Sequence, residues 1–534
     1  MARKNILTQG LKKQALALYQ SGRPHEAVAV LQRVCDKDKG DAAAWSLLGT
    51  IHASQQAYPE AEQCFSRVVS LQPTSADAHY NLARCLELQA KYDAAEAAYR
   101  RALKFGSARQ PDTCNNLGNV YRQLGRYEEA LAYYRQALTA EPRHVLALNN
   151  QGVALQALSR FEAARDSYGA ALAVKPDYAD PHYNLGNLHK AQGRYDEALA
   201  AYDAALRIDP QHPQAHWNRA LTLLALGRFD PGWQEYEWGF AAGERSSAYS
   251  PYPLWDGKPL GGRGILIQSE QGIGDEVMFA ACIPDVMGAA GRCVVECDPR
   301  VTTLFARSFP GAVVIDRAKD DQQAWLSRVP DVDVKISAGS LPRIFRPAAD
   351  AFPKHHGYLV PDPGMAAGWR DRLDQAGPGM KVGISWRGGG NARGQGLRSL
   401  ALEAWRPVLQ TPDTVFINLQ YDARPEELEQ VRRELQVTIH HWGEADALSD
   451  LDAYAALLAG LDLIVSVDNS AVHLAGALGR PVLALLPHAA DWRWMLDRED
   501  SPWYPSVKLL RQPNPGEWGA VLNRVVSEIQ SAKG

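Results

Sequence analysis

LDLIVSVDNSAVHLAGALGRPVLALLP, residues 461–487, is the stretch of sequence that decides the fold of this chain. An apolar run ends at Val467, an Ala/Leu-rich segment closed by Gly479 follows, and a second apolar run completes the stretch; this order predicts a strand, a helix and a strand. Runs that are apolar at every position are typical of strands covered on both faces, so a parallel sheet is expected. Ligands bind such sheets beyond the carboxyl ends of the strands, where residues 468–473 would lie.

The same alternation of apolar runs and helical segments extends over the C-terminal half of the chain. It predicts a first α/β lobe over 264–362 and a second over 380–512, followed by a helix within 513–534 that crosses back toward the first lobe. The further apolar runs lie at 265–268, 294–297, 312–315, 332–336, 381–386, 415–419 and 437–441.

The segment DNSAVHLAGALGRPV, residues 468–482, resembles the C-terminal signature of the heptosyltransferase-like glycosyltransferases of family 9. This resemblance implies a GT-B fold of two Rossmann-like lobes, in which Asp468, Asn469, Ser470 and His473 contact a nucleotide-sugar donor. Ser470 stands where that family usually has glycine. The alternative is a structural strand-helix-strand unit in which Asp468 only caps the helix.

A glycine-rich loop, RGGGNARGQGLRSL, follows the predicted strand at 381–386. Such a loop can approach a ligand closely, and Arg387, Arg393 and Arg398 could neutralise phosphate groups. Members of the resembled family place a basic residue here against the donor phosphate, and Arg398 fits that position best. A solvated loop without a ligand is the alternative.

The segment ILIQSEQGIGDEVMF, residues 265–279, predicts a strand, a tight loop and a helix. The third glycine of a dinucleotide fingerprint is missing, so NAD is not supported. Gly274 and Asp275 match the Gly-Asp turn of heptosyltransferases, which implies that Gly274 lies at the donor and that Asp275 acts as general base on the acceptor. Glu270 and Glu276 are alternative bases, and Asp275 as a simple helix N-cap is the structural alternative.

The N-terminal half repeats itself every 34 residues, as Gly118, Gly152 and Gly186 illustrate. Its units resemble tetratricopeptide repeats and cover residues 8–240, so an all-α superhelix is expected before the GT-B domain. A degenerate unit is expected from Thr8, with later units starting near 42, 76, 111, 145, 179 and 213.

Asparagine recurs at the sixth position of successive repeats, on the helix that faces the concave groove. An amide offers a donor and an acceptor together, so this ladder could hold a peptide backbone, as in the superhelix of O-GlcNAc transferases that it resembles. A solvated or interhelical ladder is the alternative. Its members are Asn81, Asn116, Asn150, Asn184 and Asn218.

Aromatic residues crowd two segments of the chain. FDPGWQEYEWGF, residues 229–240, predicts an end cap that packs on a neighbouring domain, with a linker at 241–263 after it. Trp492, Trp494, Trp503 and Tyr504 could stack on a base or sugar, or could pack at a domain edge.

Composition excludes several classes of function. The net charge of −4 and the lack of a basic tract argue against nucleic-acid binding, and no apolar signal core or integral membrane segment is present, so a cytoplasmic protein is expected. The seven cysteines have no metal-binding spacing. Asp331 and Asp333 form a DxD at a strand entry, which we interpret as coincidence, and we expect no metal and no cofactor besides the nucleotide sugar as co-substrate.

Together, these patterns predict an inverting glycosyltransferase that moves a sugar from a nucleotide-sugar donor to a protein held in the repeat groove. Similar repeat-transferase fusions modify flagellins, so a Ser or Thr hydroxyl of flagellin is the first acceptor to test. Two alternatives stay open. One is a surface-glycan, heptosyl-type transferase whose repeats recruit partners, and the other is a non-catalytic scaffold with a degenerate GT-B module, which the serine at position 470 favours.

Overall fold

The computed structural model describes residues 2–246, 250–317, 329, 332–389, 396, 398–445 and 447–533, with the backbone alone for residues 2–7. The chain divides into two compact units. One contains Met1–Gln192 with Asp203–Pro210, and the other contains Gly193–Tyr202 with Gln211–Gly534. Among the described helices, none combines the length and apolar composition needed to span a membrane.

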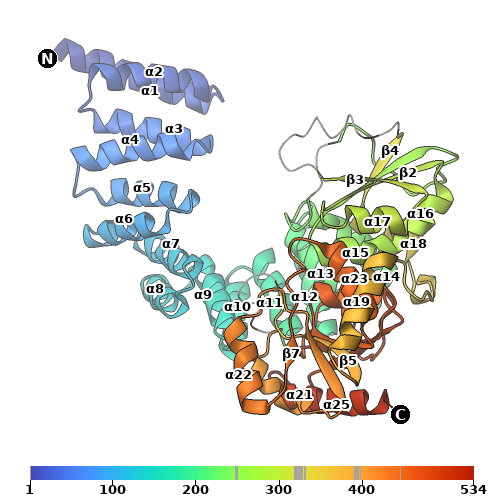
Figure 1. Ribbon diagram of the computed structural model, residues 1–534. Helices are drawn as coiled ribbons and strands as arrows, with labels where there is room; N and C mark the ends of the chain where they lie inside the picture. Colours follow the sequence, from blue (N-terminus) through green and yellow to red (C-terminus); the bar gives the residue numbers. More distant parts are fainter. Residues whose placement is uncertain are drawn as a thin grey trace. The chain divides into compact units, whose positions relative to one another are not determined.

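The first unit is built from antiparallel helix pairs that follow the predicted 34-residue register. Figure 1 shows α1 with α2, α3 with α4 and α5 with α6 as successive pairs. The helices are α1 (Ala2–Gln20), α2 (Pro24–Lys37), α3 (Ala42–Ser54), α4 (Tyr58–Leu71), α5 (Ala76–Leu88), α6 (Tyr92–Lys104), α7 (Gln110–Gln123), α8 (Tyr127–Ala140), α9 (Val145–Ala157), α10 (Phe161–Val174) and α11 (Ala179–Ala191). The next helix, α12 (Tyr195–Ile208), is divided between the two units, because its residues up to Tyr202 belong to the second.

The repeating glycines allow the two helices of a pair to approach each other closely. A Cβ atom at Gly118 would lie 2.5 Å from the ring of Tyr134, and one at Gly152 would lie 2.5 Å from the ring of Tyr168. Both rings are fully buried. In these two repeats the period of 34 therefore reflects a glycine-on-tyrosine contact, which no larger residue could make without moving the helices.

The last helix pair, α13 (Pro213–Ala225) and α14 (Phe229–Tyr236), belongs to the second unit. Trp233 of α14 is buried, donates a hydrogen bond to the carbonyl oxygen of Arg346 at 2.9 Å, and packs edge-on against Trp492 and Trp503. The predicted aromatic end cap therefore packs on the α/β part of the chain, and the boundary between compact units falls before this pair rather than at residue 240.

The segment predicted as a linker, 241–263, is packed rather than loose where the structure describes it. Trp255 is 5 % exposed and its backbone N–H bonds to the carbonyl oxygen of Lys335, beside a strand of the first lobe. Arg245 is buried in what we call the junction cluster, which comprises Arg245, Glu270, Tyr236, Glu237 and Ser340. Apolar and charged partners in the lobe hold this segment, which its Ser, Pro and Gly content alone did not predict.

The first lobe is a four-stranded parallel sheet in the order β3-β2-β1-β4. Its fully buried central strand, β1, feeds directly into α15 (Ile273–Phe279). Besides α15, the elements of this lobe are β1 (Gly264–Gln268), α16 (Ile283–Ala289), β2 (Arg292–Cys297), α17 (Thr302–Ser308), β3 (Ala312–Asp316), β4 (Val334–Ser337), α18 (Pro342–Phe345) and α19 (Pro363–Gln375).

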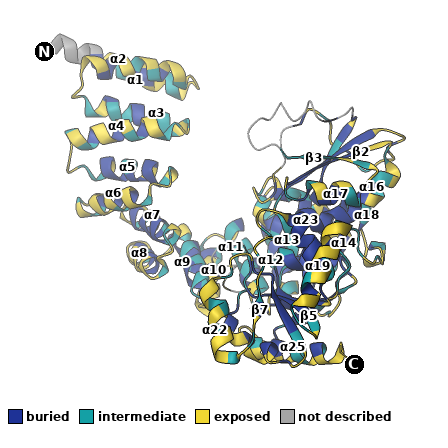
Figure 2. Ribbon diagram, in the orientation of Figure 1, coloured by how far each residue is buried: buried dark blue, intermediate teal, exposed yellow. Residues whose placement is uncertain are grey.

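The second lobe is a six-stranded parallel sheet in the order β10-β9-β8-β5-β6-β7. The stretch 461–487 forms β8, α24 and β9 as predicted, and every residue of both strands is buried. Figure 2 shows the neighbouring helix α23 buried along most of its length. The elements are β5 (Met380–Ser385), α21 (Arg406–Leu409), β6 (Thr414–Asn418), α22 (Pro425–Leu435), β7 (Ile439–His440), α23 (Leu451–Gly460), β8 (Leu463–Val467), α24 (Ser470–Ala477), β9 (Val482–Leu486) and β10 (Val507–Arg511).

The C-terminal helix, α25 (Trp518–Ser531), does not cross to the first lobe as expected. Its apolar face, which includes Val521 and Val525, joins the core around Val382 and Trp405 of the second lobe. The second sheet has an apolar face there that needs covering, and α25 covers it.

Other contacts hold the two lobes together. Arg307 of α17 forms a bidentate ion pair with Asp452 of α23, and both N–O distances are 2.7 Å. Tyr358, in the segment that connects the lobes, donates its hydroxyl proton to the carbonyl oxygen of Val277 and its backbone N–H to that of Ala477. Helices α15 and α24 therefore face each other from opposite lobes.

Candidate functional site

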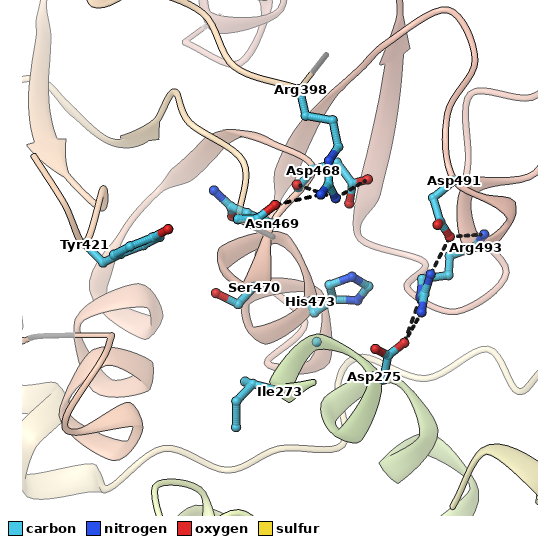
Figure 3. Close-up of a pocket in the computed structure, with 12 residues that line it drawn as sticks. Ile273, Asp275, Arg398, Tyr421, Asp468, Asn469, Ser470, His473, Asp491 and Arg493 are labelled. Carbon is cyan, nitrogen blue, oxygen red and sulfur yellow. Dashed lines mark hydrogen bonds and ion pairs between the residues drawn. The ribbon is translucent and has the colours of Figure 1, made fainter. Parts of the chain in front are cut away.

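A cavity of about 360 Å³ lies between α15 of the first lobe and the carboxyl ends of the strands of the second lobe. Seven of the residues proposed from the sequence as base or donor contacts line it (Figure 3). These residues are Gly274, Asp275, Arg398, Asp468, Asn469, Ser470 and His473. Sequence positions up to 199 residues apart are thus brought to one site.

Asn469, not Asp468, caps helix α24. Its side-chain oxygen accepts the backbone N–H of Ala471 at 3.0 Å, and its amide nitrogen donates to the Ser385 hydroxyl at 2.7 Å and to the Arg387 carbonyl at 3.1 Å. The Asn469 side chain therefore ties the end of β8 to the end of β5. The capping alternative for Asp468 is wrong, and its carboxylate is left to face the cavity.

Asp468 is 4 % exposed and pairs with Arg398, with 3.5 Å between Nη1 and Oδ2. Burial and the nearby carboxylate of Asp491 raise the pKa of Asp468, while Arg398 opposes that rise. Arg398 also donates to the carbonyl oxygen of Gly389 at 2.7 Å. Its guanidinium thus lies beside Gly389 of the glycine-rich loop, and both residues line the cavity.

Asp275 lies in the first turn of α15, whose N-cap is Gly272, so the alternative in which Asp275 is only the N-cap is wrong. Its Oδ1 accepts hydrogen bonds from Nε and Nη2 of Arg493, the first at 3.0 Å. Nη1 of Arg493 donates to Asp491 at 2.5 Å. Burial alone would lower the pKa of Arg493, but Asp275 and Asp491 outweigh it and raise that pKa. The Arg493 guanidinium, which comes from the second lobe, is therefore held between the carboxylates of Asp275 and Asp491.

The other two candidate bases point away from the cavity. Glu270 has no exposed side-chain surface and accepts hydrogen bonds from Arg245 at 2.7 and 2.9 Å and from the backbone N–H of Gly339 at 2.8 Å. Glu276 accepts the backbone N–H of Asp298 at 2.8 Å inside the first lobe. Of the three carboxylates, only Asp275 lines the cavity.

The raised pKa of the buried Glu276 side chain leads us to expect that the stability of the protein depends on pH. Burial, opposed by the Asp298 N–H and by Arg317, raises its pKa from 4.5 to about 7. The unfolded chain releases this proton at lower pH than the folded chain, so the contribution of Glu276 to stability is present at low pH and is lost as the pH rises toward 8. In Glu276→Gln, the unfolding free energy relative to wild type should rise by about 2 kcal/mol between pH 5 and pH 8.

Urea unfolding at several pH values measures this difference. Glu162→Gln is the matched control, because that side chain is 70 % exposed and should give a flat difference across the same range. A flat difference for Glu276→Gln as well would contradict the prediction.

His473 is buried and neutral, because burial, helped by the charge of Arg493, lowers its pKa to about 4. Its Nδ1 lies 2.9 Å from the Tyr504 hydroxyl, which also bonds to Tyr358. Tyr358 must donate to the Val277 carbonyl, since a carbonyl oxygen only accepts, so the chain of donors runs from His473 Nδ1 through Tyr504 to Tyr358. Nε2 of His473 is then the acceptor nitrogen.

Gly274 packs against this imidazole. A Cβ atom at position 274 would lie 3.0 Å from Cδ2 and 3.4 Å from Nε2 of His473. The glycine therefore lets α15 approach His473 across the gap between the lobes, which gives the Gly-Asp turn a steric reason as well as a chemical one.

Besides Ile273 and Gly389, three cavity residues with polar side chains were not predicted from the sequence: Tyr421, Asp491 and Arg493. A usable signal was present, because Asp491 and Arg493 follow β9 and so lie at the same sheet edge as Asp468. The aromatic residues that could have stacked on a base or sugar are packing residues: Trp492, Trp494, Trp503 and Tyr504 are all buried, and none lines the cavity.

The remaining loop arginines differ from Arg398. Arg387 is paired with Glu427 at 2.8 Å and with Asp422, so it braces α22 rather than the cavity. Arg393 and Asp331 lie outside the described residues. Within the described ranges, no group of three or more His, Cys, Asp or Glu side chains is placed to hold a metal ion.

The asparagine ladder makes contacts between repeats. Asn150 donates to Asn115 at 3.0 Å, and Asn184 donates to Asn149 at 2.9 Å. Asn116 is buried and donates to the Tyr80 hydroxyl at 3.3 Å. These are the contacts of the interhelical alternative. Asn81 is half-buried in α5, and Asn218, in the second unit, donates to the Gln214 carbonyl at 3.3 Å.

Comparisons with known families agree with this architecture. Tetratricopeptide repeat models match residues 12–76, 58–111 and 111–144, and a TPR repeat model matches 157–193 and 186–227. The model of glycosyltransferase family 9 (heptosyltransferase) matches residues 424–515, which include the Asp468 segment and Arg493. The chain therefore carries tetratricopeptide repeats and, C-terminal to them, a segment that matches the family 9 glycosyltransferase model.

Among individual proteins, the chain is 34 % identical over 311 residues to Protein FlbA of Caulobacter vibrioides. That match covers 56 % of this chain and 52 % of FlbA, so it spans about half the length of this relative. The structure is also similar to a tetratricopeptide repeat protein from Parabacteroides merdae (16 % identity, TM-score 0.41, 44 % of this chain and 93 % of that chain) and to the TPR protein YrrB (23 % identity, TM-score 0.29, 35 % and 95 %).

Proposed function

We propose that this chain is an inverting glycosyltransferase that transfers a sugar from a nucleotide-sugar donor to a protein. The observation that carries the proposal is the meeting, in one cavity, of Asp275 from the first lobe with Arg398 and the 468–473 segment from the second. A carboxylate opposite an anion-binding strand end is the arrangement that a single displacement at a sugar carbon needs.

In the proposed reaction, the donor diphosphate lies beside Arg398 and the start of α24, and the sugar extends toward Asp275. The acceptor hydroxyl oxygen attacks the anomeric carbon while its proton passes to the Asp275 carboxylate. The bond from that carbon to the phosphate oxygen breaks, and its electron pair leaves with the nucleoside diphosphate. A new glycosidic bond forms with inverted configuration, and Asp275 later releases its proton to water.

The repeats support a protein acceptor, because stacked helix pairs present an extended binding surface. We propose a Ser or Thr hydroxyl as the acceptor group and flagellin as the first protein to test. The hydrogen bonds of ladder asparagines to side chains of the preceding repeat favour one variant of this proposal, in which the repeats recruit the acceptor through other groove residues.

A thermal-shift panel of UDP-, GDP-, ADP- and CMP-sugars tests the donor site. One nucleotide class should stabilise the wild type, by roughly 2.7 kcal/mol at 100 times its Kd. The shift should disappear in His473→Ala, which removes the acceptor nitrogen, and persist in the control His25→Ala, whose side chain is exposed in the first unit. No shift with any compound would count against the transferase proposal and favour a scaffold.

The acceptor is tested separately, with the donor that the panel identifies. Purified protein should label flagellin or another protein substrate, detected as a mass increase of one sugar. Transfer to lipid or glycan acceptors alone would overturn the protein-acceptor part of the proposal while leaving the donor site intact.

A further inference from the structure

The cavity contains more negative than positive side chains. Asp275, Asp468 and Asp491 line it together with Arg398 and Arg493, and His473 is neutral. Each arginine is already engaged: Arg398 with Asp468, and Arg493 with Asp275 and Asp491. A diphosphate that enters this cavity must therefore draw at least one guanidinium away from a carboxylate, because like charges in a poorly solvated site repel strongly.

Arg493 is the guanidinium best placed to change partners. It follows β9 at the carboxyl edge of the second sheet, and its side chain is 17 % exposed to the cavity. Its Cζ lies 4.8 Å from the Trp492 ring, so the planar group is stacked and its N–H fork has a fixed orientation. Asp491, two residues away, accepts a hydrogen bond from Nη1 of Arg493 at 2.5 Å and another from its backbone N–H at 3.1 Å. This local anchor remains if the contact to Asp275 is released.

Release of Arg493 would also make the Asp275 carboxylate a stronger proton acceptor. The two hydrogen bonds that it receives from Arg493 both fall on Oδ1, and a carboxylate held by a guanidinium fork is a weak proton acceptor. Arg493 comes from the second lobe and Asp275 from the first, so a donor bound to the second lobe is positioned to compete for Arg493 and not for Asp275.

From these contacts, and resting on the transferase function proposed above, we infer that Arg493 is a catalytic residue that exchanges Asp275 for the donor diphosphate. Without donor, Arg493 masks the base. With donor, its guanidinium binds the diphosphate oxygens and stabilises the charge that develops as the sugar-phosphate bond breaks, and the freed Asp275 accepts the acceptor proton. Donor then binds before acceptor in a productive cycle.

The exchange makes an unusual prediction for binding. Asp275 competes with nucleotide for Arg493, so the isosteric change Asp275→Asn should tighten nucleotide binding by roughly tenfold even though it removes the base. Arg493→Lys keeps the charge but loses the fork, and should weaken binding by roughly tenfold. In the double variant the tightening should vanish, because the competed group is gone.

Calorimetric titration with UDP, GDP, ADP and pyrophosphate measures these affinities in the full chain. Arg498→Lys is the matched control: Arg498 lies in the same loop but pairs with the exposed Asp500 at 2.6 Å, outside the cavity. Melting temperatures close to that of the wild type establish that each variant is folded.

The outcomes separate the two proposals. If the wild type binds none of the probes, the donor site itself is refuted. If the wild type binds one, and Asp275→Asn and Arg493→Lys bind it with unchanged affinity, then Arg493 is only a strut between the lobes and the exchange is refuted. Tighter binding in Asp275→Asn together with weaker binding in Arg493→Lys supports the exchange.

Discussion

Replacing Asp275 by asparagine is expected to slow glycosyl transfer by about 10²- to 10⁴-fold, the usual contribution of a positioned general base. The amide matches the carboxylate in shape and can still contact Arg493, but it cannot take a proton from the acceptor hydroxyl. The loss should fall on kcat, since nucleotide binding is expected to be retained or tightened. Initial rates at saturating donor and acceptor measure the change.

The adjacent carboxylate provides the control. Glu276 faces the interior of the first lobe, where its Oε2 accepts the N–H of Asp298, so Glu276→Gln should transfer sugar at nearly the wild-type rate. Equal losses in Asp275→Asn and Glu276→Gln would indicate that both changes disturb α15, and the assignment of Asp275 as base would fail.

Truncating Arg245 to alanine is expected to lower the unfolding free energy of the second unit by about 3–5 kcal/mol. Arg245 and Glu270 both have side chains with no exposed surface, and they meet at 2.7 and 2.9 Å. Arg245 also donates to the Tyr236 carbonyl, Glu237 and Ser340. Its removal leaves a buried carboxylate without its counter-ion, which costs more than the lost contacts themselves.

Urea unfolding followed by tryptophan fluorescence reports on this unit, because every tryptophan except Trp45 lies at or after Trp217. The double change Arg245→Met with Glu270→Gln should recover much of the loss, since no unpaired charge remains. Arg524→Ala, which breaks an exposed pair with Glu499 in the same unit, should cost less than about 1 kcal/mol. A similarly small cost for Arg245→Ala would show that the junction cluster is not stabilising.

The architecture was predictable where the sequence carries a strict period or a wholly apolar run. The 34-residue repeat placed the helix pairs, and the run that ends at Val467 placed β8, because these patterns arise from burial that each segment meets in the same way. The boundary at residue 240 was less accurate. That boundary would be correct if all the repeat helices packed only with one another, whereas Trp233 and Tyr236 pack on the α/β lobes.

The cavity was predictable to the extent that its residues follow strands whose carboxyl ends meet. Asp468, His473 and Arg398 meet this condition, and the resemblance to family 9 added Asp275. Arg493 was missed because its partner Asp275 lies 218 residues earlier in the chain and in the other lobe. No local pattern encodes such a pair, since it depends on how two separately folded sheets face each other.

The packing of α13 and α14 bears on how such a chain can change in evolution. The point at which repeats can be gained or lost without harm lies inside the array, before residue 193, and not at its apparent end. Duplication or deletion among the earlier helix pairs would alter the reach of the array and leave the α/β unit untouched. A recombination event that exchanged the whole array would also replace the aromatic residues on which that unit is built, so arrays of different length are easier to obtain than arrays of different origin.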